Sequence, residues 1–287
     1  MQEQILEFIK QYKKNKSAVV GVFIVIILVF MAVFAPFLAS HLPADQNLVD
    51  RLIPPMWEEG GVISHILGTD DFGRDLFSRI IYGARISLMV GAVSVGLSLT
   101  FGLVMGLMAA YFGGKVDLFI MRIVDIMLAI PAILLAIVVV SILGPSLVNA
   151  MIAIGIVGIP TYARVVRASV LAEREKEYVI ASRINGSSNM RLMFKVILPN
   201  AASPIIVQST MGFASAVLEA AGLSFLGLGA QPPTPEWGAM LSDSLQFIMT
   251  APWMIFYPGL AIFFTVLGFN LMGDGLMDVL DPKLKDK

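Results

Sequence analysis

The sequence has no cysteine, which excludes disulfide bonds and thiolate metal sites. Charged residues are also scarce, at 14% of the 287 residues, whereas 57% are hydrophobic. The mean hydropathy is +0.83, and soluble domains typically contain about 25% charged residues. This shortage of charge excludes an ordinary soluble domain and indicates a polytopic membrane protein.

Sequence motifs of catalysis are missing as well. The chain has no G-x-x-x-x-G-K-[ST] phosphate loop and therefore no such motif for holding ATP. It lacks the H-E-x-x-H zinc motif and the G-x-S-x-G nucleophile elbow, and its two histidines, His41 and His65, both lie in one segment between apolar blocks. We therefore predict that the chain is not an enzyme and has no catalytic residue, metal site or cofactor of its own.

Long apolar runs make up most of the chain. A helix that crosses a bilayer needs roughly 20 mostly apolar residues, and the sequence offers six such blocks. Gly144-Pro145-Ser146 separates the third block from the fourth, as expected for a tight turn. We predict an all-α membrane protein with six transmembrane helices, near residues 18–39, 86–111, 118–143, 147–163, 201–226 and 255–273.

The positions of the basic residues predict the orientation. Cytoplasmic segments of membrane proteins are enriched in Lys and Arg, and the six-helix topology places 16 of the 20 Lys and Arg residues on one side. Both termini are therefore predicted to be cytoplasmic. The predicted division of the chain is a cytoplasmic segment 1–17, a first helix 18–39, an external segment 40–85, a five-helix core 86–280 with a cytoplasmic loop 164–200, and a tail 281–287.

Few ionisable residues fall within the predicted spans, although ion-coupled carriers usually bury several. Arg122 and Asp125 are three residues apart and are predicted to pair on one helix face. Glu219 and Ser215 lie in the fifth span, where they are candidates for a translocation path. The alternative for Glu219 is a structural carboxylate at a helix interface. A self-sufficient ion-coupled carrier remains the alternative function.

Two other patterns predict packing and membrane anchoring. Small residues recur every four positions in the second and fifth spans, which favours close helix packing in lipid. Trp237 and Trp253 are predicted to be interface anchors, with a gating role as the alternative. The two predicted packing seams consist of Ser94, Ser98, Gly102, Gly106 and Ala110, and of Gly212, Ala216, Ala220 and Ser224.

The loop 164–200 is a charged segment in an otherwise apolar chain. The sequence predicts a helix over 172–184, a break at Gly186 and a second helix over 187–197 with Ser187 or Ser188 as N-cap. From the residues alone, this loop is either an amphipathic surface helix on anionic lipid or a docking site for a soluble partner.

The same loop resembles the cytoplasmic Glu-Ala-Ala loop of bacterial ABC importer permeases. Ala181-Ser182, Gly186 and Leu198-Pro199 keep the spacing of that motif, but Ile180 stands where the family has Glu and Ser182 replaces the second Ala. Longer motifs, in the order found in the peptide branch of the family and in its dipeptide permeases, extend the resemblance over the whole chain. They occupy residues 67–79, 83–88, 177–179, 181–183, 226–238, 270–275 and 280–283.

The resemblance implies a type I ABC importer permease fold in a bacterial inner membrane. It also implies half of a translocation path for dipeptides or short oligopeptides, with haem, nickel complexes or glutathione as alternative solutes. The implied partners are a homologous second permease, two ATPases that bind ATP and Mg, and a periplasmic solute-binding protein, with no nucleic acid.

The resemblance also assigns roles to residues. Those implied to contact the ATPases are Glu177, Tyr178, Ile180, Ala181, Ser182, Arg183, Gly186, Leu198 and Pro199. Those implied to dock the binding protein or to act as a gate are Asp70, Arg74, Asp75 and Trp237.

Overall fold

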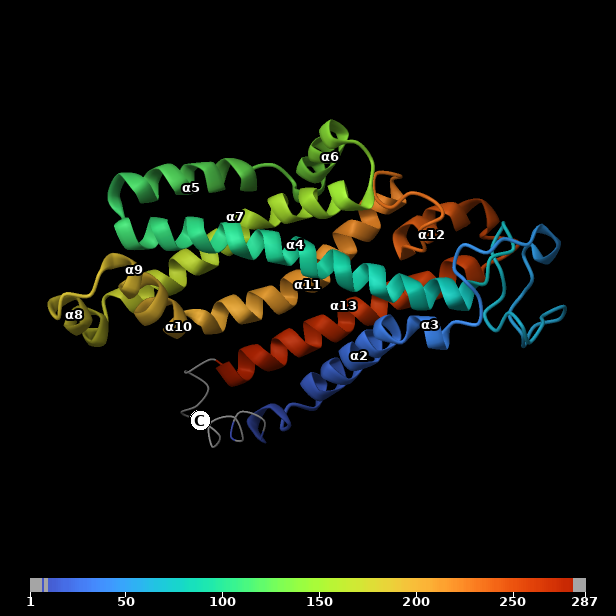
Figure 1. Cartoon of the computed structure of the whole chain (residues 1–287), viewed down its shortest axis with the longest axis horizontal. Coiled ribbons are helices and arrows are strands. Elements are labelled where there is room, and N and C mark those ends of the chain that lie inside the picture. Colours follow the sequence, from blue (N-terminus) through green and yellow to red (C-terminus); the bar gives the residue numbers. More distant parts are fainter. Residues whose placement is uncertain (1–6, 8–9, 281–287) are drawn as a thin grey trace.

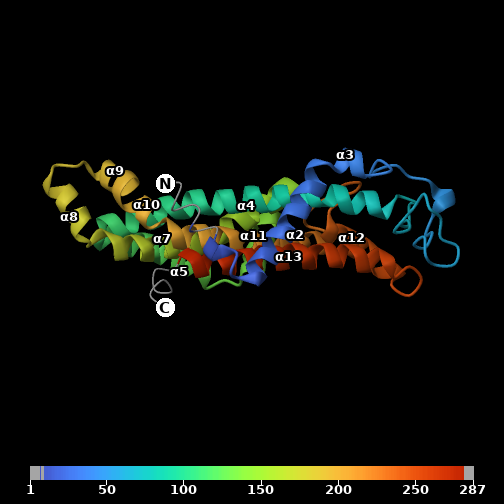
Figure 2. The same cartoon turned by 90° about the horizontal axis from the view of Figure 1, so that it is seen from below.

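The computed structural model describes residues 7 and 10–280, and this part of the chain forms an elongated, flattened bundle of helices (Figures 1 and 2). Among the described residues, β pairing is limited to an isolated bridge between Thr69 and Asp75. The predicted tail 281–287 lies outside the described residues, as do parts of the predicted segment 1–17. The predicted all-α class is confirmed.

Long apolar helices form the body of the bundle. Within the described residues, five are long and apolar enough to cross a membrane, and a bent pair brings the number to six if it counts as one span. The five are α2 (Lys16–Val33), α4 (Leu76–Phe112), α7 (Leu147–Arg174), α11 (Ala202–Phe225) and α13 (Trp253–Leu280). The pair is α5 (Gly114–Leu128) and α6 (Ala132–Leu143).

Short helical elements connect the long helices. They are α3 (Ala35–Leu38), η1 (Leu48–Asp50), α8 (Glu177–Ile184), α9 (Asn189–Arg191), η2 (Leu192–Ile197), α10 (Leu198–Asn200), α12 (Trp237–Ser244) and η3 (Leu245–Phe247). Of these, η2 is a single π-helical stretch.

The predicted third span, 118–143, is not one continuous helix. The chain bends by 92° between α5 and α6. Pro131 lies at this break and is the N-cap of α6. Proline has no N–H to donate and disfavours helical backbone in the residue before it, so an unbroken helix is disfavoured here.

Two other helix boundaries differ from the prediction. Helix α4 begins at Leu76, inside the predicted external segment 40–85, because Asp75 caps it by accepting a hydrogen bond from the Ser78 N–H. Helix α7 continues to Arg174 instead of ending near residue 163. The predicted end of the fourth helix is therefore wrong, since hydropathy falls at residue 164 while the helical backbone continues.

Helices α4 and α7 pack along the small-residue seam predicted for α4. A Cβ added to Gly102 would lie 2.4 Å from the Tyr162 Cβ, and one added to Gly106 would lie 2.5 Å from the Ala163 oxygen. Ser94 and Ser98 donate hydrogen bonds to backbone oxygens of α7. Because the hydrophobic effect gives little help between helices in lipid, this close approach supplies the packing contacts.

The connecting segments lie at opposite ends of the bundle. Residues 40–75 lie at one end, and α8 lies at the other (Figure 1). The beginning of α2 and the end of α13 lie together, since Asn15 donates to the Asp278 carboxylate at 2.7 Å. They lie in the half of the molecule that carries α8 (Figure 1). That this half faces the cytoplasm stays a prediction.

Both tryptophans predicted to be interface anchors are buried within the chain. Trp237 is 1% exposed and donates its indole N–H to the Ile80 oxygen at 3.1 Å. Trp253 is 8% exposed and donates to the Thr69 oxygen at 3.1 Å. The anchor prediction is therefore wrong: both indoles hold neighbouring segments together instead of lying at a lipid surface.

Candidate functional site

The segment between α7 and α11, residues 175–201, is called the projecting loop below. It extends past the ends of the long helices, and α8 lies at its tip (Figures 1 and 2). It is shorter than the predicted loop 164–200 because α7 includes residues 164–174. Its position at one end of the bundle makes it accessible to a soluble partner.

Local sequence explains where α8 begins and ends. Glu177 lies in its first turn and Arg183 in its last turn, as the helix dipole favours. After the helix, Gly186 adopts a φ of +77°. The Gly186 N–H bonds to the Arg183 oxygen and the Ser187 N–H bonds to the Ser182 oxygen. This is a Schellman ending, in which glycine supplies the left-handed residue, and the predicted break at Gly186 is confirmed.

The second half of the projecting loop returns the chain to the bundle. Ser188 is the N-cap of α9 and accepts a hydrogen bond from the Arg191 N–H. The chain continues through η2 into α10, where Pro199 occupies the first turn. Proline has no backbone N–H to donate, and its ring clashes with the carbonyl group four residues earlier in an α-helix. The wider π turn of η2, which precedes Pro199, makes room for the ring. The predicted second helical segment over 187–197 with Ser188 as N-cap is confirmed, although it consists of a short α-helical part, α9, followed by the π-helical η2.

Buried side chains fix the projecting loop to the bundle. Val179 of α8 and Leu192 and Ile197 of η2 are buried in one cluster with Leu107 of α4 and Val166 of α7. Burial of each such side chain stabilises by roughly 1.5–3 kcal/mol relative to exposure. The loop is therefore attached to α4 and α7 by an apolar core.

Polar contacts add to this attachment. Arg174 donates to the Ala110 oxygen near the end of α4, and the Tyr111 hydroxyl donates to the Asn189 side chain at 2.7 Å. At the base of α8, the Tyr178 hydroxyl donates to the Glu173 carboxylate. Burial and this hydrogen bond raise the pKa of Tyr178 to about 12.

The outward side of α8 is partly apolar. Tyr178 is 39% exposed, Ile180 43% and Ile184 80%. The residues Glu177, Ala181, Arg183, Gly186 and Pro199 are exposed, whereas Ser182 and Leu198 are half-buried. Within the described residues Arg183 has no ion pair. A fixed helix with apolar side chains and an arginine is suited to docking a partner, since arginine can form forked bonds to a carboxylate.

A second feature lies midway along the bundle. Glu219 and Ser215 of α11 line a cavity of about 190 Å³ together with Ser98 of α4, Tyr162 of α7 and Gln208 of α11. Leu128 and Ala132, on either side of the break between α5 and α6, line it as well. The structure thus brings the two predicted path residues to one cavity beside a broken helix. Their role in translocation stays a prediction.

The predicted pair between Arg122 and Asp125 is wrong. Asp125 instead accepts a hydrogen bond from Arg164 of α7 at 2.6 Å. A spacing of three residues permits Arg122 and Asp125 to pair within α5. However, α7 packs beside α5 and supplies Arg164 as the partner instead. Asp117 of α5 likewise receives two hydrogen bonds of 2.6 Å from Arg167. Two arginines of the predicted loop therefore join α7 to α5.

The residues predicted to dock a binding protein or to gate are buried at the other end of the bundle. Arg74 donates its Nε to the Asp70 carboxylate at 2.6 Å, and both side chains are buried with Asp75 and Trp237. Asp75 caps α4, and Trp237 packs against Gly83. Direct contact with a partner is not available to these buried side chains in this conformation, so their effect on docking or gating stays a prediction.

Three residues of these two features could not be found by the sequence motifs: Ile184, Tyr162 and Gln208. Ile184 is the most exposed apolar residue of α8, and its spacing of four from Ile180 was an available signal. Tyr162 and Gln208 face the same cavity as Glu219. No local pattern marks these two residues, because they come together only when α7 packs against α11.

Comparison with known proteins gives consistent matches. Residues 102–286 match the family described as binding-protein-dependent transport system inner membrane component. Residues 4–55 match the N-terminal TM domain of oligopeptide transport permease C.

Individual relatives match over nearly the whole chain. The dipeptide transport system permease protein DppC of Escherichia coli (strain K12) is 57% identical, over 97% of this chain and 93% of its own. That of Alkalihalophilus pseudofirmus is 55% identical, over 97% of this chain and 90% of its own.

A solved structure shares the fold. An inward-facing structure of the MetNI methionine ABC transporter has a TM-score of 0.58 at 22% identity, over 71% of this chain and 96% of that chain. With family, relatives and fold in agreement, this chain belongs to the family of binding-protein-dependent transport system inner membrane components.

Proposed function

We propose that the chain is the permease subunit of an ATP-driven importer and forms half of a path for dipeptides across the bacterial inner membrane. The observation that carries this proposal is the projecting loop: a fixed helix with exposed apolar residues on a chain that has no phosphate-loop motif. Energy from ATP then has to enter through a docked partner. Family membership supports the same direction.

The substrate is inferred from relatives. Dipeptide transport permeases are 50–57% identical to this chain, whereas a glutathione transport permease of Pectobacterium atrosepticum is 43% identical. The higher identity favours dipeptides over glutathione. In this proposal the Glu219 carboxylate attracts the ammonium group of the peptide, while Ser215 and neighbouring hydroxyls replace water in its hydrogen bonds.

The mechanism follows from how the projecting loop is attached. Movement of α8 is transmitted to α7 and η2 through the cluster that contains Val179. Helix α7 carries Tyr162, and α11, which follows the loop, carries Glu219; both residues line the central cavity. A partner that shifts α8 therefore acts on two walls of the proposed path. This is rigid-body coupling between two packed arrangements.

The proposed assembly contains a homologous second permease, two cytoplasmic ATPases that hold ATP and Mg, and a periplasmic binding protein. This chain performs no hydrolysis and holds no cofactor in it. Its role is to convert closure of the ATPases into alternating access of the path. The binding protein delivers the peptide to the periplasmic end of the path.

The test is reconstitution in proteoliposomes. We expect uptake of a labelled dipeptide to require both permeases, the ATPases, the binding protein and ATP. A labelled tripeptide, glutathione, haem and a nickel complex tested in parallel compare the solutes. Uptake by this chain alone under a proton gradient would refute the proposal and establish an ion-coupled carrier.

A further inference from the structure

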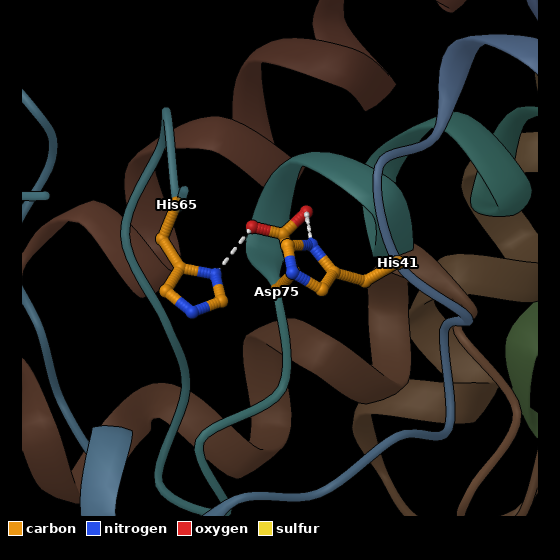
Figure 3. A group of neighbouring side chains, drawn as sticks. All are labelled: His41, His65 and Asp75. Carbon is orange, nitrogen blue, oxygen red and sulfur yellow. Dashed lines mark hydrogen bonds and ion pairs between the residues drawn. The ribbon is translucent and has the colours of Figure 1, made fainter. Parts of the chain in front are cut away.

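Both histidines of the chain converge on one carboxylate (Figure 3), at the end of the bundle opposite α8. The His65 Nδ1 lies 3.0 Å from Asp75 Oδ1, and the His41 Nδ1 lies 3.8 Å from Asp75 Oδ2. One potential ligand atom from each residue lies within 4.8 Å of the others. Three separate stretches of sequence thus supply a group of two imidazoles and one carboxylate.

The spacing of these atoms fits a small divalent cation. Zinc binds imidazole nitrogens and carboxylate oxygens at about 2.0–2.2 Å in tetrahedral sites, which places neighbouring ligand atoms about 3.3 Å apart. The observed separations of 3.0 Å and 3.8 Å lie on either side of this value. Because the three ligand atoms lie within 4.8 Å of one another, side-chain rotations are needed to bring all of them to bonding distance.

The carboxylate is held in place by a second layer of hydrogen bonds. Asp75 Oδ2 accepts from the Ser78 N–H at 2.8 Å and from the Ser78 hydroxyl at 2.6 Å. The His41 backbone N–H donates to the same hydroxyl at 3.1 Å. Such bonds orient metal-binding carboxylates and reduce the entropy lost on binding. Oδ1 is directed to His65 (Figure 3).

Charge also favours a cation here. The side chain of Asp75 is 0% exposed, and its ion-pair partners among the described residues are the two imidazoles. A buried carboxylate needs compensating positive charge. The N-terminus of α4 supplies only a partial charge. A divalent cation supplies a full positive charge to the carboxylate.

The group is accessible at the surface of the molecule. The His41 side chain is 35% exposed, whereas that of His65 is 9% exposed. A cation can therefore enter beside His41 and keep a water molecule as its fourth ligand. With two imidazoles, one carboxylate and no thiolate, the ligand set suits Zn²⁺ better than Ca²⁺ or Mg²⁺, which prefer oxygen ligands.

We propose that His41, His65 and Asp75 bind one Zn²⁺ ion, and that the ion fastens the segment 40–75 to the beginning of α4. The proposal differs from the sequence-based prediction that the chain has no metal site. It is independent of the transported solute. The bound ion holds the segment 40–75 against the end of the bundle, next to the buried residues around Arg74.

The experiment measures metal binding directly. The full chain, purified in lipid nanodiscs with a tag that contains no histidine, is stripped with chelator and titrated with ZnCl₂ by calorimetry. We expect one Zn²⁺ per chain, confirmed by elemental analysis after desalting. Co²⁺ is expected to give the visible absorption of a four-coordinate site and to be displaced by Zn²⁺.

Variants locate the site. Asp75→Asn keeps an N-cap for α4 but removes the charge, and we expect it to weaken Zn²⁺ binding at least tenfold. The double variant His41→Asn and His65→Asn is expected to abolish binding. Asp45→Asn, which changes an exposed acid of the same segment, is the matched control and is expected to bind as the wild type does.

Thermal melting establishes whether each variant is folded. Zn²⁺ is expected to raise the melting temperature of the wild type and of Asp45→Asn, but not that of Asp75→Asn. Absence of stoichiometric binding to the wild-type chain overturns the proposal. So does binding that survives in the folded Asp75→Asn variant or in the double histidine variant.

Discussion

Ile184→Ala is expected to weaken docking of the ATPases while leaving the permease folded. Ile184 is 80% exposed at the end of α8. The substitution removes three carbons, and each buried CH₂ contributes about 0.8 kcal/mol. Multiplying this sum by the exposed fraction of Ile184 gives a loss of about 2 kcal/mol in the free energy of docking. Such a loss raises the dissociation constant of the ATPase about 30-fold. Stability changes by only about 0.5 kcal/mol or less, because the side chain packs little within the chain.

The assay compares two isoleucines at opposite ends of the bundle. Ile63, in the outer segment, is 86% exposed, so Ile63→Ala removes the same atoms from an equally open position. With both permeases in nanodiscs, ATPase affinity is measured by biolayer interferometry and stability by thermal melting. Ile63→Ala is expected to leave the affinity unchanged. The reasoning fails if Ile184→Ala binds as the wild type does, or if both variants weaken binding equally.

Four further outcomes are expected. Gly83→Ala places a Cβ 2.3 Å from Trp237 Nε1 and 2.8 Å from the Pro235 oxygen, so melting assays should show roughly 1–3 kcal/mol of destabilisation. Gly96→Ala in the same helix meets nothing within 4 Å and should lose no stability; equal melting of the two variants contradicts the packing argument. Glu219→Gln should reduce dipeptide uptake at least tenfold while ATPase binding is unchanged, with Thr210→Val on the same helix as control; undiminished uptake removes Glu219 from the path. Arg164→Gln should destabilise by roughly 0.5 kcal/mol and Arg122→Gln by less, since Asp125 contacts Arg164; the reverse order supports the local pair. Burial raises the pKa of Glu236 above its usual value of 4.5, so the folded chain holds this proton more tightly than the unfolded chain; its contribution is present below pH 4.5 and is lost as pH rises through the folded pKa. The melting temperature should therefore fall less between pH 4.5 and 7 in Glu236→Gln than in the wild type, and identical slopes refute this assignment.

Helix type and several boundaries could be predicted because they depend on local chemistry. Apolar runs of sufficient length identify the membrane helices, since unpaired backbone groups are costly in lipid. Gly186 was recognised as a break because a left-handed residue is needed to end α8. The motif spacing around Ala181 and Leu198 led to the correct family.

The errors share one cause, which is that hydropathy and local spacing do not report long-range packing. The end of α7 was placed too early because charge begins at Arg164, yet Asp125 and Asp117 on α5 satisfy Arg164 and Arg167. Trp237 was assigned to a lipid interface because tryptophan is common there, but its N–H is bound to the Ile80 oxygen.

By itself, the sequence determined the membrane class, the helical content, the family and the position of the charged loop. Composition, the length of apolar runs and motif spacing can be read without knowing which segments pack together. Only the tertiary structure decided which residues meet. It brought Glu219 beside Tyr162 in one cavity, fixed α8 through Val179, and placed His41 and His65 on Asp75. These contacts depend on packing between segments that are distant in sequence, and close contact, charge pairing and burial together decide how those segments pack.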